Sequence, residues 1–189
     1  MSPGTICSYI WLVFVVVWIV MAFGTKTTRQ RESVSSRLSY TVFVIVAFYL
    51  VFGKEIIQPW LRMRLFQPSP ITNWLGVALT AAGIGFAIWA RLYLGSNWSG
   101  AVTVKVGHEL VRTGPYRFVR HPIYTGLITA LLGTGLLRAQ VRSLIAIVLL
   151  YVGFKMKSKI EERTMIETFG VQYDEYSRTT GAIIPKLHL

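Results

Sequence analysis

Long stretches without a charged residue constrain this chain more than any other feature of its sequence. Residues 71–90 carry no charge, and neither do residues 121–137 if histidine is counted as neutral. Shorter uncharged runs cover residues 13–23, 39–53 and 143–154. A helix needs roughly 20 apolar residues to cross the hydrocarbon core of a bilayer. The pattern predicts an all-α, polytopic membrane protein with about five transmembrane helices, near residues 8–24, 39–58, 71–94, 121–138 and 141–160.

The charges lie between these apolar runs, and most of them are positive. The net charge is +12 although only 15% of residues are charged. Fourteen lysines and arginines fall within residues 24–38, 95–120 and 155–189, whereas five fall on the other side of the predicted spans. Cytoplasmic loops carry the excess of lysine and arginine, so we predict an external N-terminus and a cytoplasmic C-terminus. Because the charges alternate with apolar runs, they indicate contact with the lipid bilayer and not with nucleic acid.

Several other features have plain structural interpretations. The first 23 residues lack the basic start of a signal peptide, so we interpret them as the first span. Cys7 is the only cysteine and is expected to pack in the bundle, and the three histidines lack ligand spacing, so no metal site is predicted. Small residues such as Gly83, Gly85, Gly133 and Gly135 are expected to let helices pack closely.

One long polar connection, residues 94–120, stands beside the apolar runs. Its four glycines and one proline prevent it from forming a single helix, and Gly114-Pro115 indicates a turn. The connection ends at Arg120 and His121, and Pro122 is well suited to be the first residue of the next helix. A helix N-terminus presents unpaired backbone N–H groups, so this junction is a candidate anion site with Arg120 and His121 as added donors.

A second group of ionisable residues follows the last predicted span. Glu161 and Glu162 come directly after it, and Lys157 and Glu161 are i,i+4 neighbours on one helix face. Ionisable groups at membrane depth are costly and usually functional. A solvated helix end with ordinary ion pairs is the alternative interpretation of the same pattern.

The two segments together resemble the isoprenylcysteine carboxyl methyltransferases and their phospholipid methyltransferase relatives. The resemblance covers residues 95 to 185, and the chain looks like a short prokaryotic member. The Arg-His-Pro element followed by a Glu-Glu pair one helical hairpin later is its most specific part. The matching pieces are Gly95-Ser96-Asn97-Trp98, His108-x-Leu110-Val111-x-x-Gly114-x-Tyr116, Arg120-His121-Pro122-x-Tyr124-x-Gly126, Glu161-Glu162 and Phe169-Gly170-x-x-Tyr173-x-x-Tyr176.

This resemblance implies S-adenosylmethionine as a cofactor, held by a cytoplasmic loop and a C-terminal helical tail. Residues 1–94 would supply three membrane helices, and residues 95–189 would form the catalytic region. Lys157, Glu161 and Arg120 become the catalytic candidates, and Lys157 and Asn97 the substrate-binding candidates. The implied cofactor-binding residues are Thr103, His108, Leu110, Val111, Tyr116, His121, Pro122, Tyr124 and Glu161.

Lys157 departs from the pattern of the family. Members that act on prenylated cysteine have a substrate-binding arginine at this position, and lysine lacks the bidentate fork that grips a carboxylate. The resemblance therefore implies methyl transfer to a lipophilic membrane acceptor, of isoprenoid or phospholipid type, without fixing which one. The reaction is expected at the cytoplasmic face of a prokaryotic inner membrane.

Two other functions fit parts of the pattern. A membrane reductase of the same superfamily would bind a nicotinamide cofactor, with Arg112, Arg117 and Arg120 contacting its phosphates. A small membrane sensor or assembly partner is the non-enzymatic alternative, but it has no need for the histidine, tyrosine and Arg-His-Pro constellation.

Overall fold

Five long helices make up most of the chain. The computed structural model describes residues 1–189 except 24–27, 32, 54–57, 96–102, 106–109 and 187–189. The long helices are α1 (Pro3–Val20), α2 (Val34–Phe52), α3 (Pro70–Leu94), α4 (Pro122–Arg138) and α5 (Val141–Phe169). Two short 3-10 helices, η1 (Pro59–Arg62) and η3 (Gly114–Arg117), lie in connections, and α6 (Val171–Thr179) follows α5. The predicted helical architecture is confirmed.

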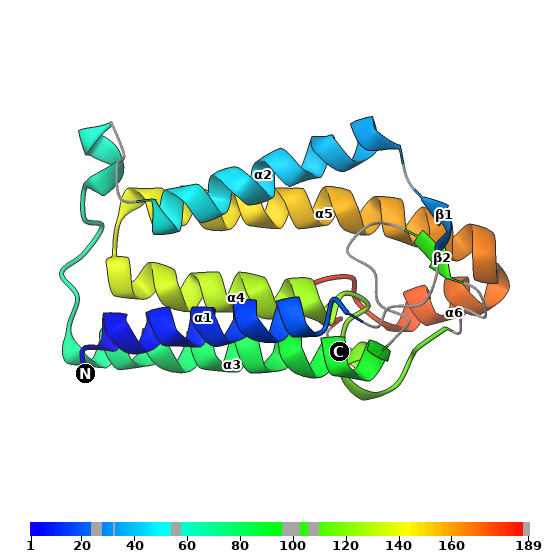
Figure 1. Cartoon of the computed structure of the whole chain (residues 1–189), viewed down its shortest axis with the longest axis horizontal. Coiled ribbons are helices and arrows are strands. Elements are labelled where there is room, and N and C mark those ends of the chain that lie inside the picture. The colour runs from blue at the N-terminus through cyan, green and yellow to red at the C-terminus, as the bar shows by residue number, and fades with distance from the viewer. Residues whose placement is uncertain (24–27, 32, 54–57, 96–102, 106–109, 187–189) are drawn as a thin grey trace.

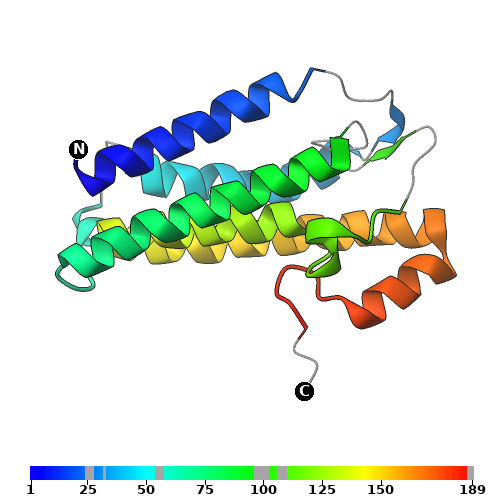
Figure 2. The same ribbon diagram turned by 90° about the horizontal axis from the view of Figure 1, so that it is seen from below.

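The long helices lie side by side and roughly parallel (Figure 1). Helix α3 packs against α1 on one side and α4 on the other, while α5 joins α4 to α2. Figure 2 shows the same bundle from below, with α6 and the C-terminal tail gathered at the end where α4 begins. The N-terminus lies at the opposite end of the bundle.

Polar caps and prolines set the starts of these helices. The side chains of Ser2, Ser33 and Ser69 each accept a hydrogen bond from a backbone N–H in the first turn of α1, α2 and α3. Such caps satisfy donors that would otherwise have no partner. Helices α1 and α2 therefore begin at Pro3 and Val34, earlier than the spans predicted at 8 and 39. Pro122 is the first residue of α4, as predicted.

Helix α5 continues well beyond the predicted span at 141–160. It is 29 residues long and ends at Gly170, whose φ of 51° few other residues adopt. No proline or glycine interrupts residues 154–169. Glu161 and Glu162 consequently lie within a continuous helix, whose rigid backbone fixes their direction.

Glycines bring α3 and α4 into backbone contact. A Cβ added at Gly83 would lie 2.4 Å from the backbone of Gly126 and Ala130, and one at Gly133 would lie 2.5 Å from the backbone of α3. Close packing through small residues is thus confirmed for both. At Gly85 the expectation is wrong, because no atom lies within 4 Å of an added Cβ.

A buried polar node links three helices inside the bundle. The indole N–H of Trp11 donates to the Thr134 hydroxyl at 2.9 Å, and the Cys7 thiol lies 3.5 Å from the hydroxyls of Thr80 and Thr134. Cys7 is buried, as predicted for a packing residue. These bonds satisfy the polar groups of α1, α3 and α4 where water is excluded.

A short β-ribbon was not predicted. Strand β1 (Thr28–Arg31) follows α1, and strand β2 (Thr103–Lys105) lies in the long polar connection, and the two pair antiparallel. The ribbon joins the connection between α1 and α2 to the connection between α3 and α4, at the end of the bundle where α6 lies (Figure 1). Thr103 lies in β2.

Within the described ranges, three helices are long and apolar enough to cross a membrane on their own: α1, α2 and α3. Many of their large apolar side chains point outward, as expected for contact with lipid. Helix α4 has 17 residues, and α5 carries Lys155 and Lys157 near its middle. The count of five spans therefore stays a prediction.

Candidate active site

Charged side chains from two distant parts of the sequence meet at the start of α4. Arg120 and His121 directly precede that helix, and Lys157, Glu161 and Glu162 project from α5. All five side chains are largely buried, with exposed fractions between 9% and 22%. Buried charged groups are costly unless they are paired and hydrogen-bonded, so these five side chains are expected to contact one another.

His121 bridges the two glutamates. Its Nδ1 lies 3.2 Å from Oε2 of Glu161, and its Nε2 lies 3.0 Å from Oε1 of Glu162. Both ring nitrogens therefore face carboxylate oxygens, which the doubly protonated imidazolium satisfies by donating from each. Burial alone would lower the pKa of His121, but the hydrogen bonds and charges of the two glutamates raise it. Burial would likewise raise the pKa of each glutamate, yet the hydrogen bond to His121 leads a set of contacts that lowers it.

Arg120 holds the neighbouring segments together. Its Nε and Nη2 donate to Oε1 of Glu162 at 3.1 and 2.8 Å. Its Nη1 donates to the backbone carbonyls of Ser177 and Thr180, at the end of α6. The guanidinium thus connects the start of α4 to α5 and α6 at once, and these contacts engage all three of its nitrogens.

Tyr124 connects Glu161 to an aromatic stack. Its hydroxyl donates to Oε1 of Glu161 at 2.6 Å. Its ring stacks on His121 at 5.3 Å and on Phe154 at 4.5 Å between centroids. The Lys157 ammonium lies 3.8 Å from the same Oε1 of Glu161. One carboxylate therefore contacts a tyrosine, a histidine and a lysine.

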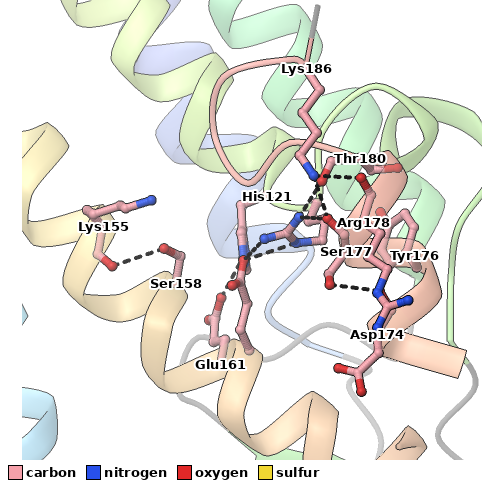
Figure 3. A network of polar contacts seen from close by, with 12 residues as sticks. His121, Lys155, Ser158, Glu161, Asp174, Tyr176, Ser177, Arg178, Thr180 and Lys186 are labelled. Atoms are coloured by element: carbon pink, nitrogen blue, oxygen red, sulfur yellow. Dashed lines mark hydrogen bonds and ion pairs between the residues drawn. The ribbon is translucent and has the colours of Figure 1, made fainter. Parts of the chain in front are cut away.

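The residues after α6 form a strap over the start of α4, which we define as residues 180–183. The carbonyls of Gly181 and Ala182 accept from the backbone N–H groups of Arg120 and His121 at 2.8 and 2.9 Å. The Thr125 hydroxyl donates to the Ile183 carbonyl at 2.6 Å. Figure 3 shows His121 and Glu161 near the tail residues of this network. The strap thus engages the backbone N–H groups of the two residues that directly precede α4.

The remaining predicted cofactor residues differ in their surroundings. Tyr116 in η3 is buried, its hydroxyl donates to the Ala90 carbonyl at 3.4 Å, and burial together with the charge of Glu161 raises its pKa. Pro122 is fully buried, Val111 packs on the core, and Leu110 is partly buried in the connection before η3. His108 and Asn97 lie outside the described residues.

Sequence reasoning left several members of the cluster out of the site. Glu162 was part of the motif but was not assigned a role, although it pairs with both Arg120 and His121. Phe154 and Tyr40 supply aromatic rings from spans that the sequence marks only as apolar. Among the described residues, no group of three or more acidic, histidine or cysteine side chains is placed to hold a metal ion.

The family model for phospholipid methyltransferases matches residues 71–172, which include nearly all of α3, the whole of α4 and all five residues of the charged cluster. The chain belongs to this family of integral membrane methyltransferases.

Among curated proteins, the chain is 38% identical over 129 residues to the protein-S-isoprenylcysteine O-methyltransferase of Saccharomyces cerevisiae, covering 65% of this chain and 54% of the yeast protein. It is 25% identical over 189 residues to methanethiol S-methyltransferase 1 of Bradyrhizobium diazoefficiens, covering 91% of this chain and 63% of that protein. An uncharacterized protein of Bacillus subtilis, YpbQ, is 26% identical over 129 residues, covering 65% of this chain and 75% of the relative.

A solved structure is also similar. The eukaryotic intramembrane Ras methyltransferase, an isoprenylcysteine carboxyl methyltransferase, matches with a TM-score of 0.57 and 25% identity, over 79% of this chain and 50% of that one. The chain therefore spans about half the length of this structure and of the yeast relative.

Proposed function

We propose that this protein transfers a methyl group from S-adenosylmethionine to a lipophilic acceptor held in the membrane. The observation that carries the proposal is the convergence on Glu161. Residues assigned to the cofactor, His121 and Tyr124, and the lysine assigned to the acceptor all lie within 4 Å of its carboxylate. Methyl transfer needs its two reactants side by side, and positioning of this kind is worth about 7–11 kcal/mol in favourable cases.

The residues present fit the cofactor. S-adenosylmethionine, when bound, supplies a methyl group already activated by a positively charged sulfur, together with an amino group and a carboxylate. Glu161 and Glu162 offer two carboxylates that remain about one-fifth exposed, so each can accept a further cationic donor. Leu110 and Val111 are partly buried apolar residues of the connection before η3. The acidic pair suits the cationic groups of the cofactor, and apolar side chains suit its aromatic base.

Each charged residue then has a distinct task. Glu161 binds the cationic end of the cofactor, and His121 and Tyr124 hold the Glu161 carboxylate in one orientation. Arg120 is a positioning residue, because its nitrogens are engaged by Glu162 and by the carbonyls of Ser177 and Thr180. Lys157 orients the acceptor through its positive charge.

The acceptor enters from the bilayer. Helices α1 and α2 present apolar outer faces, whereas the charged groups lie at the start of α4 and on α5. A lysine without a bidentate fork accommodates a carboxylate or a lipid phosphate. The yeast and Bradyrhizobium relatives differ here, since the first is a methyltransferase of isoprenylcysteine and the second of methanethiol.

The proposed orientation follows the charge distribution. The end with the cluster would face the cytoplasm of a prokaryotic inner membrane, with the N-terminus outside. Residues 95–189 would form the catalytic region on the three helices of residues 1–94. The reductase alternative is weakened, because Arg120 is already engaged by protein groups and is not left for a nucleotide phosphate.

Binding of radiolabelled S-adenosylmethionine to the purified protein tests the proposal directly. We expect saturable binding that a reduced nicotinamide dinucleotide does not displace. Methyl transfer is then measured to S-farnesylcysteine, to phosphatidylethanolamine vesicles and to an alkanethiol, and lipid extracts of cells with and without the protein are compared. Displacement by the nicotinamide compound would support the reductase, and an absence of binding to either would contradict an enzymatic role.

A further inference from the structure

Tyr40 brings a polar hydroxyl to the buried face of α2. Large apolar side chains such as Leu38 and Ile45 point outward from this helix. Tyr40 is only 4% exposed and lies on the same inward-facing side of the helix as Ala47. It also lies outside residues 71–172, the region that the family model matches.

The ring of Tyr40 faces the acceptor lysine of the proposed site. The Lys157 ammonium lies over the Tyr40 ring at 5.5 Å from its centroid, and over the Tyr124 ring at the same distance. Oε1 of Glu161 lies 3.8 Å away. Two aromatic faces and one carboxylate, contributed by α2, α4 and α5, therefore surround this ammonium.

A largely buried lysine needs an arrangement of this kind, which we call the cage of Lys157: the rings of Tyr40 and Tyr124 and the carboxylate of Glu161. The ammonium group is strongly hydrated in water and sits on a flexible four-carbon stem, so it needs partners when it is 13% exposed. Aromatic faces within about 6 Å attract a cation through the ring quadrupole, and they do so without neutralising it. The two rings therefore stabilise the ammonium beside Glu161 without adding a second negative charge, which would repel an anionic acceptor.

Close packing of α2 on α5 fixes Tyr40 at this position. A Cβ added at Gly153 would lie 3.0 Å from Cβ of Phe43 and 3.2 Å from the carbonyl oxygen of Tyr40. The backbone of α2 thus approaches α5 at Tyr40 itself, one helical turn before Lys157. Tyr124 is fixed separately, by Glu161 and by its stack on Phe154.

We propose that Tyr40 is a positioning residue of the methyl-transfer site, which holds the Lys157 ammonium against Tyr124 for an anionic acceptor. The inference rests on the proposed function, because it assigns Lys157 to the acceptor. It adds α2 to the elements that build the site, so that a helix from the N-terminal part of the chain determines where the acceptor is held.

The test compares Tyr40→Leu, Tyr40→Phe and the control Tyr49→Leu, which changes an exposed tyrosine on the same helix. The first readout is the NMR signal of the Lys157 side chain in protein labelled at the lysine ε-carbon, assigned with Lys157→Arg. Ring currents from the two tyrosines shift this signal in the wild type. We expect Tyr40→Leu to remove much of the shift, and Tyr40→Phe and Tyr49→Leu to retain it.

Function gives the second readout. S-adenosylmethionine affinity should stay within about twofold in Tyr40→Leu, while methyl transfer to the acceptor that the wild type uses should fall about three- to thirtyfold, the range expected for losing one cation–π contact. Tyr40→Phe should restore the transfer. If the Tyr40→Leu protein no longer binds the cofactor, Tyr40→Met is used in its place, because the unbranched methionine side chain fills the space without a ring.

The two proposals fail in different ways. A Lys157 signal that does not move in either ring-free variant overturns the role of Tyr40, whatever the cofactor result. A signal that moves in a protein without affinity for S-adenosylmethionine supports the cage and overturns the proposed function. Equal transfer in Tyr40→Leu and wild type, with Lys157 needed in both, also overturns the role of Tyr40.

Discussion

Replacing Gly83 with alanine should destabilise the bundle, whereas the same change at Gly85 should not. The new Cβ at Gly83 would lie 2.4 Å from Ala130 N and from Gly126 O, both of which are backbone atoms and cannot turn away. Ordinary contact needs about 3.5 Å, so α3 and α4 must separate by about 1 Å along much of their shared face. Gly85 has no atom within 4 Å of an added Cβ and lies on the same helix.

The magnitude follows from two opposing terms. Alanine in place of glycine within a helix stabilises by about 0.5–1 kcal/mol through backbone entropy, and Gly85→Ala should show this gain alone. Gly83→Ala carries the same gain together with an overpacking cost of about 1–3 kcal/mol or more. We therefore expect Gly83→Ala to unfold at a temperature several degrees below Gly85→Ala.

Thermal unfolding of the purified variants in one detergent, followed by circular dichroism, measures this difference. S-adenosylmethionine binding is a second readout, because His121 directly precedes α4 and Pro122 is its first residue, so a shifted α4 would move both. Equal melting temperatures for the two variants would show that α3 and α4 are not in backbone contact, and would refute the packing described above.

Further predictions concern the charged cluster and the orientation of the chain. Lys157→Ala should leave S-adenosylmethionine affinity nearly intact and reduce turnover at least tenfold, about 1.4 kcal/mol. Lys157→Arg should retain part of the activity and Lys157→Met should not. Full activity in Lys157→Met would contradict a role of Lys157 in binding the acceptor. Glu161→Ala should weaken cofactor binding itself, measured by calorimetry, and unchanged affinity would remove it from the site. The pKa of His121 is raised above its ordinary value near 6.5. The charged imidazolium therefore stabilises the fold fully below about pH 6.5, and this stabilisation is lost as the pH rises through the raised pKa. The melting temperature of the wild type, but not that of His121→Gln, should fall across that pH window. Cysteine labelling should reach position 2 (Ser2→Cys) from outside and position 177 (Ser177→Cys) from the cytoplasm, and the reverse pattern would reject the predicted topology.

The sequence is sufficient to predict the helices, because long apolar runs have few other ways to satisfy their backbones in a membrane. It also indicates the first residue of α4, since Pro122 fits only the first turn, and the contact at Gly83. Helix ends are predicted less well. Ser2 and Ser33 cap their helices several residues before the apolar runs begin, and hydropathy alone does not detect a cap.

The charged cluster is predicted in composition but not in connectivity. Arg120, His121 and Glu161 can be selected from the sequence as candidates. Their pairing depends on a fold that brings together residues about forty positions apart, and the partner that completes it is Glu162. The sequence also did not indicate that the carbonyls of residues 181 and 182 bind the backbone N–H groups just before α4, about sixty positions earlier.

The strap at residues 180–183 has a consequence for biosynthesis. Arg120 and His121 emerge from the ribosome about sixty residues before the carbonyls that bind their N–H groups. In that interval α4, α5 and α6 are synthesised, and the chain turns at Gly170 between α5 and α6. The strap can therefore close over the start of α4 only after residue 183 has emerged, and a nascent chain stalled before residue 180 would carry the residues of the charged cluster without the strap that covers them.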